Sequence, residues 1–457
     1  MLKIPHVSVI GAGLAGCEVA FQLANANIPV LLYEMKPHKH SPAHISNNFA
    51  ELVCSNSLRS NSLNSAIGLL HEELRALGSL CLHSAYTNRV PAGDALAVDR
   101  ENFSKTITNT IKKHPNITVI NEEITQIPME NIVVIATGPL TTEGLSNSII
   151  ELIGEKSLNF FDAIAPIVHK DSIDFSKAWW QSRYNKTGND YINCGLTEEE
   201  YNTFYNALIT ADSIDAKNWE QDIPFFEGCL PIEVMANRGK QTLLFGCMKP
   251  VGLLNPHTQE QPFAALQLRQ DNNYGTLYNI VGFQTRLKYA EQKKVLRLIP
   301  ALKNAEFAKL GSIHKNTFIN SPRVLNGNLS LKNNSNIFFA GQITGCEGYC
   351  ESIAMGFLCA LFIKQQIFKA TFTLPKISAL HAILNHVINS ENSNFQPSNI
   401  NFGLFPNLDL SNSVVANSKK IPKKVKREKI CELALQNLVI LQEDLLNKKL
   451  ITKQPTT

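Results

Sequence analysis

A glycine-rich turn near the start of the chain constrains its fold more than any other feature. The turn follows the apolar run Val7 to Ile10 and opens a helix-like stretch, Cys17 to Ala24. Glycines at such a turn allow the backbone to approach a pyrophosphate, which then lies at the helix N-terminus. The pattern predicts a Rossmann-like dinucleotide site whose contacts come from Gly11, Ala12, Gly13, Leu14, Ala15 and Gly16.

An acidic residue follows at the distance that this kind of site requires. The second predicted strand, Val30 to Tyr33, ends directly before Glu34, about 20 residues after the glycines. A carboxylate at that place can bind the ribose hydroxyls of an adenosine. We therefore predict that Glu34 binds the cofactor.

Two later turns indicate which dinucleotide is bound. Each follows a buried-strand run, Ile132 to Ile135 and Ile337 to Phe339, and they lie about 200 residues apart. A simple nicotinamide dehydrogenase needs only the first motif, whereas many flavoproteins return to their FAD-binding fold late in the chain. The ordered triplet favours FAD, with further contacts from Gly138, Gly341, Gln342, Ile343 and Thr344.

The predicted fold class is α/β: a Rossmann-like FAD-binding domain of the glutathione-reductase type, interrupted by an α+β domain and followed by a short helical segment. Between the second and third turns aromatic residues become frequent, and we expect short strands there, such as Thr242 to Cys247. Long helices are expected at Glu351 to Gln366 and Ile430 to Lys448. The predicted parts are 1–160 (first FAD part), 161–304 (inserted substrate-side domain), 305–372 (FAD return) and 373–457 (C-terminal loop and helix).

We expect a cytoplasmic protein, because neither a signal peptide nor a membrane span is predicted from the sequence. The chain is 44% hydrophobic and 18% charged, which is ordinary for a globular protein. No apolar run reaches the ~18 residues of a membrane span, and Met1 to Pro5 leads straight into the first strand without room for a signal peptide. Ten cysteines in a cytoplasmic protein predict free thiols, and their spacing predicts no metal site.

Two cysteines lie in segments that do not resemble a protein core. Cys54 has small polar neighbours and Arg59 close by, a cation that favours a thiolate. Cys229 follows a glycine and precedes Pro231 by two residues, which indicates a fixed loop. The alternative for any cysteine is a buried small apolar residue, and we adopt it for Cys17, Cys81, Cys247, Cys359 and Cys431.

Seven stretches between residue 7 and residue 406 carry a family resemblance. The chain resembles the folate- and FAD-dependent tRNA (uracil-5-)-methyltransferases, bacterial enzymes that make ribothymidine in the T-loop. The stretches are VIGAGLAGCEVAFQLA, FAELVCSNSLRS, FEGCLPIEVMANRG, GTLYNIVGFQT, IHKNTFINSP, FAGQITGCEGYCESIAMG and INFGLFP.

The resemblance implies a reaction and two catalytic residues. Methylenetetrahydrofolate would supply the carbon, NADH or NADPH the reducing equivalents, and the T-loop uridine at tRNA position 54 would be methylated at C5. Cys229 matches the thiol that adds to uracil C6, and Cys54 matches a second essential cysteine with a proton-transfer or flavin-side role. The partners implied are the tRNA T-arm and the two co-substrates, with no membrane and no metal.

Supporting roles are less defined by the sequence. Tyr349 either packs in the core or faces the flavin, and the polar residues Asn279, Gln284 and Thr285 either line a pocket or are satisfied internally. The basic residues that could follow RNA phosphates are Lys288, Lys293, Lys294 and Arg297, and a C-terminal run comprising Lys419, Lys420, Lys423, Lys424, Lys426, Arg427 and Lys429.

Three other functions stay open beside this interpretation. A related enzyme could methylate a ribosomal RNA uridine, and the motifs would look the same. A tRNA wobble-uridine modifier of the same flavoprotein superfamily would be longer, with a large helical C-terminal region, whereas about 90 residues follow the last FAD helix here. A flavoprotein that has lost catalysis would not need both Cys54 and Cys229.

Overall fold

A parallel sheet forms the centre of the larger part of the molecule. The structure, a computed structural model, describes residues 6–154, 158–185, 189–214, 230–389, 395–407 and 422–452. Five strands pair in the order β16-β7-β1-β2-β6, all parallel. Their bounds are β1 Val7–Ile10, β2 Val30–Tyr33, β6 Ile117–Ile120, β7 Ile132–Ile135 and β16 Ile337–Phe339.

Helices cover this sheet and form one large apolar core with it. Tyr349–Phe368 (α11) packs against Leu14–Ala24 (α1), and a Cβ at Gly356 would lie 2.5 Å from the Ala15 carbonyl oxygen, so only glycine permits this approach. The other helices around this core are α2 Ala66–Ala76, α3 Leu80–Thr87, α4 Arg100–Lys113, α5 Glu143–Ile153, α10 Ser321–Val324, α12 Ala379–Ile388 and α13 Lys423–Asn447.

A second, antiparallel sheet forms its own core in the middle third of the chain. Its strands pair in the order β10-β11-β12-β13-β9-β14, every neighbouring pair antiparallel. The bounds are β9 Ile167–His169, β10 Ala178–Trp180, β11 Tyr191–Leu196, β12 Ala264–Gln270, β13 Leu277–Ile280 and β14 Phe307–Lys309. Its helices are α6 Glu198–Thr210, α7 Ile232–Asn237, α8 Thr242–Phe245 and α9 Tyr289–Leu296.

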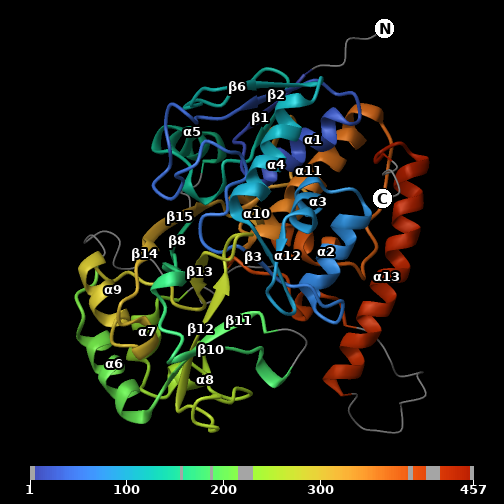
Figure 1. The fold of residues 1–457 in the computed structure, drawn as a ribbon. Coiled ribbons are helices and arrows are strands. Elements are labelled where there is room, and N and C mark those ends of the chain that lie inside the picture. The colour runs from blue at the N-terminus through green and yellow to red at the C-terminus, as the bar shows by residue number, and fades with distance from the viewer. Residues whose placement is uncertain are drawn as a thin grey trace.

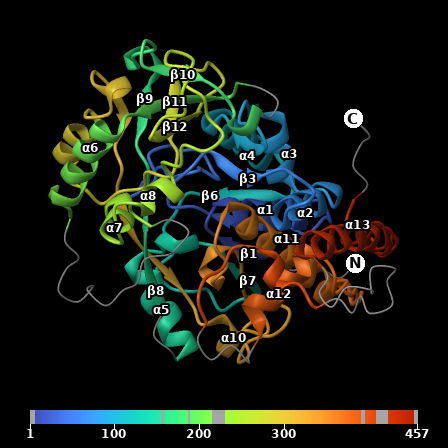
Figure 2. The same ribbon diagram turned by 90° about the horizontal axis from the view of Figure 1, so that it is seen from below.

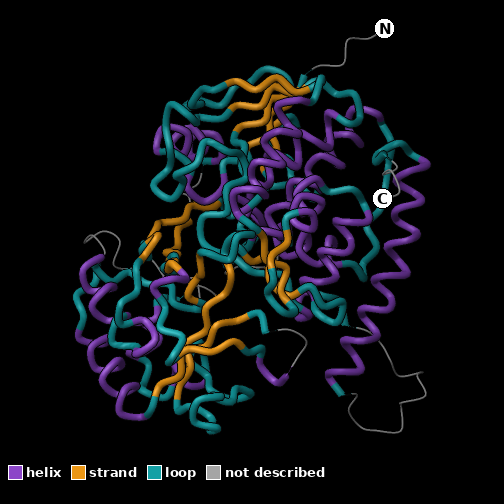
Figure 3. The backbone as a smooth tube through the Cα atoms, viewed as in Figure 1, coloured by secondary structure: helices purple, strands orange, loops and turns teal. Residues whose placement is uncertain are grey.

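Small sheets join the two cores. A pair, β8 Leu158–Ala163 and β15 Ile313–Phe318, carries the chain out of the first core and back into it. A three-stranded sheet contains β3 Ser57–Ser60, β4 Arg89–Val90 and β5 Ala95–Val98. Figure 1 shows the parallel sheet and the second sheet at opposite ends of the molecule. Figure 3 shows the same separation of the strands, and Figure 2 places α13 on the side opposite α6.

One predicted strand was wrong. The segment from Thr242 contains the helix α8 (Thr242–Phe245), not a strand. Of its apolar residues only Leu243 is fully buried, while Phe245 is exposed, so the run has one inward face instead of the alternation of a strand. A short apolar run carries no period that separates the two structures. The predicted helices are confirmed: α11 extends two residues further at each end, whereas α13 begins seven residues earlier, at Lys423, and ends one residue earlier, at Asn447.

Although Glu351 and Lys364 interrupt its apolar run, the helix α11 is long and apolar enough on average to cross a membrane by length and composition. Most of its residues are buried against α1 and the other helices of the first core. This is how the core helix of a globular fold behaves. Its buried lysine, Lys364, donates to the Leu450 carbonyl, and burial lowers the Lys364 pKa to about 7.

We expect Lys364→Met to stabilise the protein, by about 2–4 kcal/mol at pH 7. The unfolded chain binds a proton up to the ordinary pKa of 10.5, while the folded chain releases it near 7. Wild-type stability should therefore rise between these two values, and the variant should lack this rise. Urea unfolding at pH 6, 7.5 and 9 measures the free energy of unfolding of the wild type and of the variant. A wild-type-to-variant difference that is equal at all three pH values would contradict the assignment.

Candidate functional site

The first glycine turn joins β1 to α1 in a conformation that requires glycine. Gly11 has φ +99°, and a Cβ there would lie 2.8 Å from the Ala136 carbonyl oxygen. A Cβ on Gly16 would lie 1.8 Å from the Gly11 oxygen. Gly13 differs, because no atom lies within 4 Å of the place that its Cβ would take. Space therefore remains beside Gly13, at the N-terminus of α1, where an anion is favoured.

This space belongs to a first cavity that fits the adenosine and pyrophosphate part of a dinucleotide. Glu34 lies in its wall, and the carboxylate accepts hydrogen bonds from the Ala12 amide at 2.9 Å and the Lys36 amide at 3.1 Å. These two hydrogen bonds from backbone amides fix the Glu34 carboxylate at the end of β2, next to the turn. The wall includes three residues of the turn, Gly11, Ala12 and Gly13, whereas Leu14, Ala15 and Gly16 begin α1 behind it.

The second glycine turn lies where this cavity meets another. Gly138 begins a short 3₁₀ turn, Gly138–Leu140, after β7, with φ +67° and no atom within 4 Å of the place that a Cβ would take. Leu140 lines both cavities, so they adjoin at this turn. An elongated cofactor can therefore extend from the first cavity into the second.

The third glycine turn contributes one side chain to the second cavity. Gln342 lines it and donates to Glu347 at 2.6 Å. Gly341 has φ +80°, and a Cβ there would lie 2.6 Å from the Ala15 side chain. The side chains of Ile343 and Thr344 are buried, and the Thr344 hydroxyl donates to the Gly341 carbonyl. Ile343 and Thr344 therefore support the turn from the protein interior and do not line the second cavity.

The second cavity is about 270 Å³ in volume and lies between the two cores. Elements from both cores supply its wall. From the first core come Cys54, Arg59, Gln342, Glu347 and Tyr349. Arg269 comes from β12, Asn316 from β15, and Gln284 from the loop that follows β13. A planar ring bound here would have polar groups on several sides.

Cys54 lies in this wall, in a segment that we call the Cys54 loop (residues 52–56). Its thiol is half-buried and lies 3.7 Å from the Ala163 carbonyl oxygen. The amides of Cys54 and Ser55 both donate to the Tyr349 hydroxyl, at 2.9 and 3.1 Å. Burial raises the pKa of that phenol, and the nearby Cys54 adds to the rise. Tyr349 therefore contacts the cysteine loop directly while lining the cavity.

Cys229 lies outside the described residues. The described chain resumes at Leu230, and the Ile232 amide donates to the Gln284 carbonyl oxygen at 2.7 Å. Gln284 lines the second cavity, so the residues that follow Cys229 are attached to its wall.

A family model and curated relatives match nearly the whole chain. The model described as "Glucose inhibited division protein A" (GidA) matches residues 6–370. The methylenetetrahydrofolate–tRNA-(uracil-5-)-methyltransferase TrmFO of Paramagnetospirillum magneticum is 57% identical over 406 residues, covering 88% of this chain and 91% of that protein. The enzyme of the same name from Zymomonas mobilis is 52% identical over 436 residues, covering 94% and 96%.

The chain belongs to the TrmFO group of the GidA family. Its fold is that of a solved relative, GidA of Aquifex aeolicus, with a TM-score of 0.67 at 13% identity, covering 98% of this chain and 74% of that one. A second crystal form of that protein gives 0.65. The predicted fold class, a Rossmann-type flavoprotein fold, is confirmed.

Arg59 lines the same cavity as Cys54, but the partner that the structure gives its side chain is an acidic residue. Its guanidinium forms an ion pair with Glu351, at the start of α11. Burial raises the pKa of the Glu351 carboxyl, and Arg59 opposes this rise. The cations that contact the Cys54 loop in this TrmFO-group chain are instead Arg100, Arg269 and Lys309, which sequence reasoning missed.

Asn316 is a further cavity residue that the sequence did not single out. It is 3% exposed, and its side-chain nitrogen has no partner among the described residues. It lies within the family-matching stretch IHKNTFINSP, which was the available signal. Three polar residues were predicted either to line a pocket or to be satisfied internally. Gln284 lines the second cavity. Thr285 donates to Glu233 at 2.9 Å, and Asn279 is buried in β13 and lines neither cavity.

The five cysteines predicted to be buried differ in how far they are shielded from solvent. Cys17, Cys81, Cys359 and Cys431 are buried, and Cys247 is half-buried. Burial raises the pKa of the Cys17, Cys81 and Cys359 thiols, which disfavours thiolates. Within the described ranges no group of three or more His, Cys, Asp or Glu side chains is arranged to hold a metal.

Several of the basic residues considered for RNA are engaged within the protein. Lys288 pairs with Asp212, Lys294 with Glu291, and Arg297 donates to the Ala305 carbonyl oxygen. On α13, Lys424 and Lys429 pair with acidic residues one turn away. Lys419 and Lys420 lie outside the described residues.

Proposed function

We propose that this protein methylates C5 of a uridine in the T-loop of tRNA. The carbon comes from methylenetetrahydrofolate and the reducing equivalents from NADH or NADPH. Membership of the TrmFO group supports methylenetetrahydrofolate and a tRNA uracil as substrates, because the relatives' names state them. The observation that carries the proposal is the second cavity, which places Cys54 in the same wall as Gln342 and beside the turn that leads to the dinucleotide site.

The first cavity and its glycine turns fit FAD. The Glu34 carboxylate lies where ribose hydroxyls would bind, and the free space at Gly13 accepts a pyrophosphate at the α1 N-terminus. When bound, FAD would carry two electrons from the nicotinamide to the transferred one-carbon group, so that a methylene becomes a methyl. Gly138 and Gln342 would then border the ring end of the cofactor.

Cys229 supplies the nucleophile in this proposal. Its thiolate adds to uracil C6 and forms a C–S bond, and the electron pair moves toward C5, which then attacks the one-carbon group. The one-carbon group leaves its carrier nitrogen as the C5 proton is lost, and a hydride equivalent, which bound FAD would supply, reduces the methylene to a methyl group. Departure of the thiolate then restores the ring. Ile232, three residues further along the chain, donates its amide to the carbonyl oxygen of the cavity residue Gln284, which supports this assignment.

Cys54 takes the second role, on the cofactor side of the cavity. Its thiol is within reach of a ligand in the second cavity, and its loop is held by Tyr349. A thiol in this place can hold or release a proton during the reaction. We place the protein in the cytoplasm, where tRNA, folate and nicotinamide cofactors are available.

We expect ribothymidine to form in tRNA only when methylenetetrahydrofolate is present. Purified protein is incubated with FAD, NADH or NADPH, and either ¹³C-labelled methylenetetrahydrofolate or labelled S-adenosylmethionine, on separated tRNA and ribosomal RNA. Nucleoside mass spectrometry then reads the label. A flavin has no evident use in a simple sulfonium methyl transfer. Label from S-adenosylmethionine would overturn the donor, and label confined to ribosomal RNA would overturn the RNA substrate.

A further inference from the structure

Besides Tyr349, cationic side chains from three distant elements hold the Cys54 loop. Arg100, at the start of α4, donates from Nη1 to the Leu52 carbonyl at 2.6 Å and from Nη2 to the Cys54 carbonyl at 3.5 Å. Lys309, on β14, donates to the Val53 carbonyl at 3.3 Å. Three consecutive carbonyl groups of the loop therefore accept from cations, one of which belongs to the second sheet.

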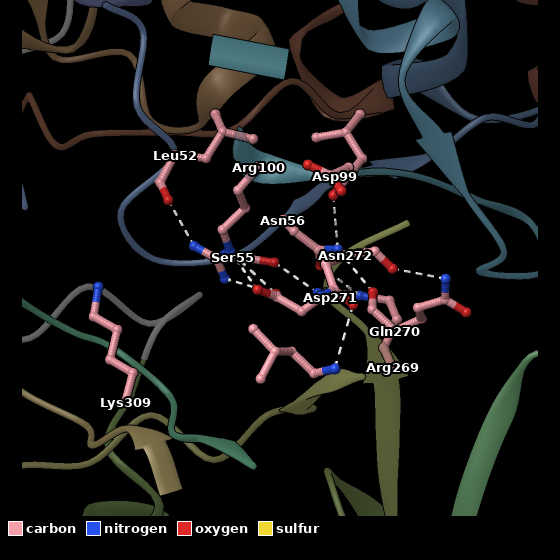
Figure 4. A network of polar contacts seen from close by, with 12 residues as sticks. Leu52, Ser55, Asn56, Asp99, Arg100, Arg269, Gln270, Asp271, Asn272 and Lys309 are labelled. Carbon is pink, nitrogen blue, oxygen red and sulfur yellow. Dashed lines mark hydrogen bonds and ion pairs between the residues drawn. The ribbon is translucent and has the colours of Figure 1, made fainter. Parts of the chain in front are cut away.

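The second sheet contributes a further contact at the end of β12. Arg269 donates from Nη2 to the Ser55 hydroxyl at 2.7 Å and from Nε to the Asn56 side-chain oxygen at 3.1 Å. Asn56 in turn donates to the Gln270 carbonyl at 2.8 Å and to the Val98 carbonyl at 3.0 Å. Figure 4 shows Arg269 and Gln270 close to Ser55 and Asn56. Asn56 is completely buried, so its bonds are sheltered from water.

An ion pair connects Arg100 to Asp271, the residue that directly follows β12. Arg100 donates to both oxygens of Asp271, from Nε at 2.9 Å and from Nη2 at 3.0 Å. Both side chains are largely buried. Although burial opposes the charge, Asp271 keeps the Arg100 pKa above its ordinary value. Asp271 thus fixes the guanidinium whose remaining N–H groups reach Leu52 and Cys54.

We propose that Arg269 and the Arg100–Asp271 pair are positioning residues for Cys54. They bind the Cys54 loop to the end of β12, so that the place of the thiol in the cavity depends on how the second sheet docks on the first core. The catalytic consequence rests on the proposed function, in which Cys54 is essential. The positioning itself does not, because it concerns only where the thiol lies.

Arg100 and Asp271 can act on a ligand only through the Cys54 loop. Neither Arg100 nor Asp271 lines the second cavity, so their influence on a ligand passes through the Cys54 loop. Arg269 lines the cavity as well, and replacing it removes a cavity group and a loop contact together. Asp271→Asn is therefore the cleaner variant: it keeps one acceptor oxygen and the volume but removes the charge that orients Arg100.

The test measures Cys54 alkylation by iodoacetamide in the FAD-loaded protein, with the modified peptide identified by mass spectrometry. We compare wild type with Asp271→Asn, Arg269→Gln and Arg269→Lys. Arg183→Gln is the matched control, because Arg183 also donates to a β12 residue, Gln267 at 2.9 Å, but does not contact the Cys54 loop. Thermal unfolding and flavin absorbance verify that each variant is folded.

We expect Asp271→Asn and Arg269→Gln to change the Cys54 alkylation rate by about fivefold or more, because the loop gains freedom. Arg269→Lys should lie between them and wild type, since one amine cannot reach both acceptors. With tRNA as substrate, kcat should fall by about 100-fold with little change in KM for tRNA.

Wild-type alkylation rates in both Asp271→Asn and Arg269→Gln would overturn the proposal, as would an equal change in Arg183→Gln. If Asp271→Asn and Arg269→Gln do not fold, Arg269→Lys alone decides, and a wild-type rate in that variant counts against positioning. An altered alkylation rate in a protein that methylates no RNA supports the positioning and refutes only the proposed function. The two failures are thereby distinguishable.

Discussion

Cys229→Ala should abolish methylation of tRNA, lowering turnover by about 10⁴-fold or more, while the flavin stays bound. Uracil C5 becomes nucleophilic only after a thiolate adds at C6, and alanine offers no such group. Wild type should also form an adduct with tRNA that carries 5-fluorouridine at the target, because fluorine blocks the final loss of the C5 substituent. The adduct should survive denaturation and be seen by gel electrophoresis, and Cys229→Ala should not form it.

Cys54→Ala is the matched comparison for this experiment. It removes the other candidate thiol, which lines the second cavity, and leaves Tyr349 free to hold the loop amides. We expect it to lose turnover but to keep adduct formation. If Cys229→Ala still forms the adduct and Cys54→Ala does not, the roles of the two cysteines are reversed.

Gly13→Val should yield a folded protein without flavin, with FAD affinity reduced by about 100-fold or more. Gly13 has φ −74°, which any residue can adopt, and no protein atom lies within 4 Å of a Cβ there. The valine side chain would therefore enter the space that we assign to the pyrophosphate instead of disturbing the core. Absorbance near 450 nm after reconstitution with FAD, with circular dichroism for the fold, measures both properties.

Two other glycine variants serve as controls for the effect of Gly13→Val on flavin binding. Gly327→Val is the matched control, since the nearest atom to a Cβ there is in the Ile388 side chain at 3.7 Å, and neither residue lines either cavity. It should bind FAD normally. Gly16→Ala should instead impair folding, because its Cβ would lie 1.8 Å from the Gly11 oxygen. Normal flavin content in Gly13→Val would refute the pyrophosphate assignment.

The local sequence determined the parts of the fold that depend on neighbouring residues. The turn from Gly11 to Gly16, with an apolar strand before it and a helix after it, predicted the first βαβ unit and the acidic residue Glu34 beside it. These features follow from backbone geometry that a few adjacent residues impose. The short run at Thr242 carried no such period, and its helix was therefore missed.

The surroundings of Cys54 were decided by tertiary structure alone. The sequence offered Arg59, but that side chain pairs with Glu351, 292 residues away in the chain. The contacts that hold the Cys54 loop come from Tyr349, 295 residues away, and from Arg269, 214 residues from Ser55. No local pattern specifies such pairs, because they form only when the second sheet docks on the first core and removes their charges from water.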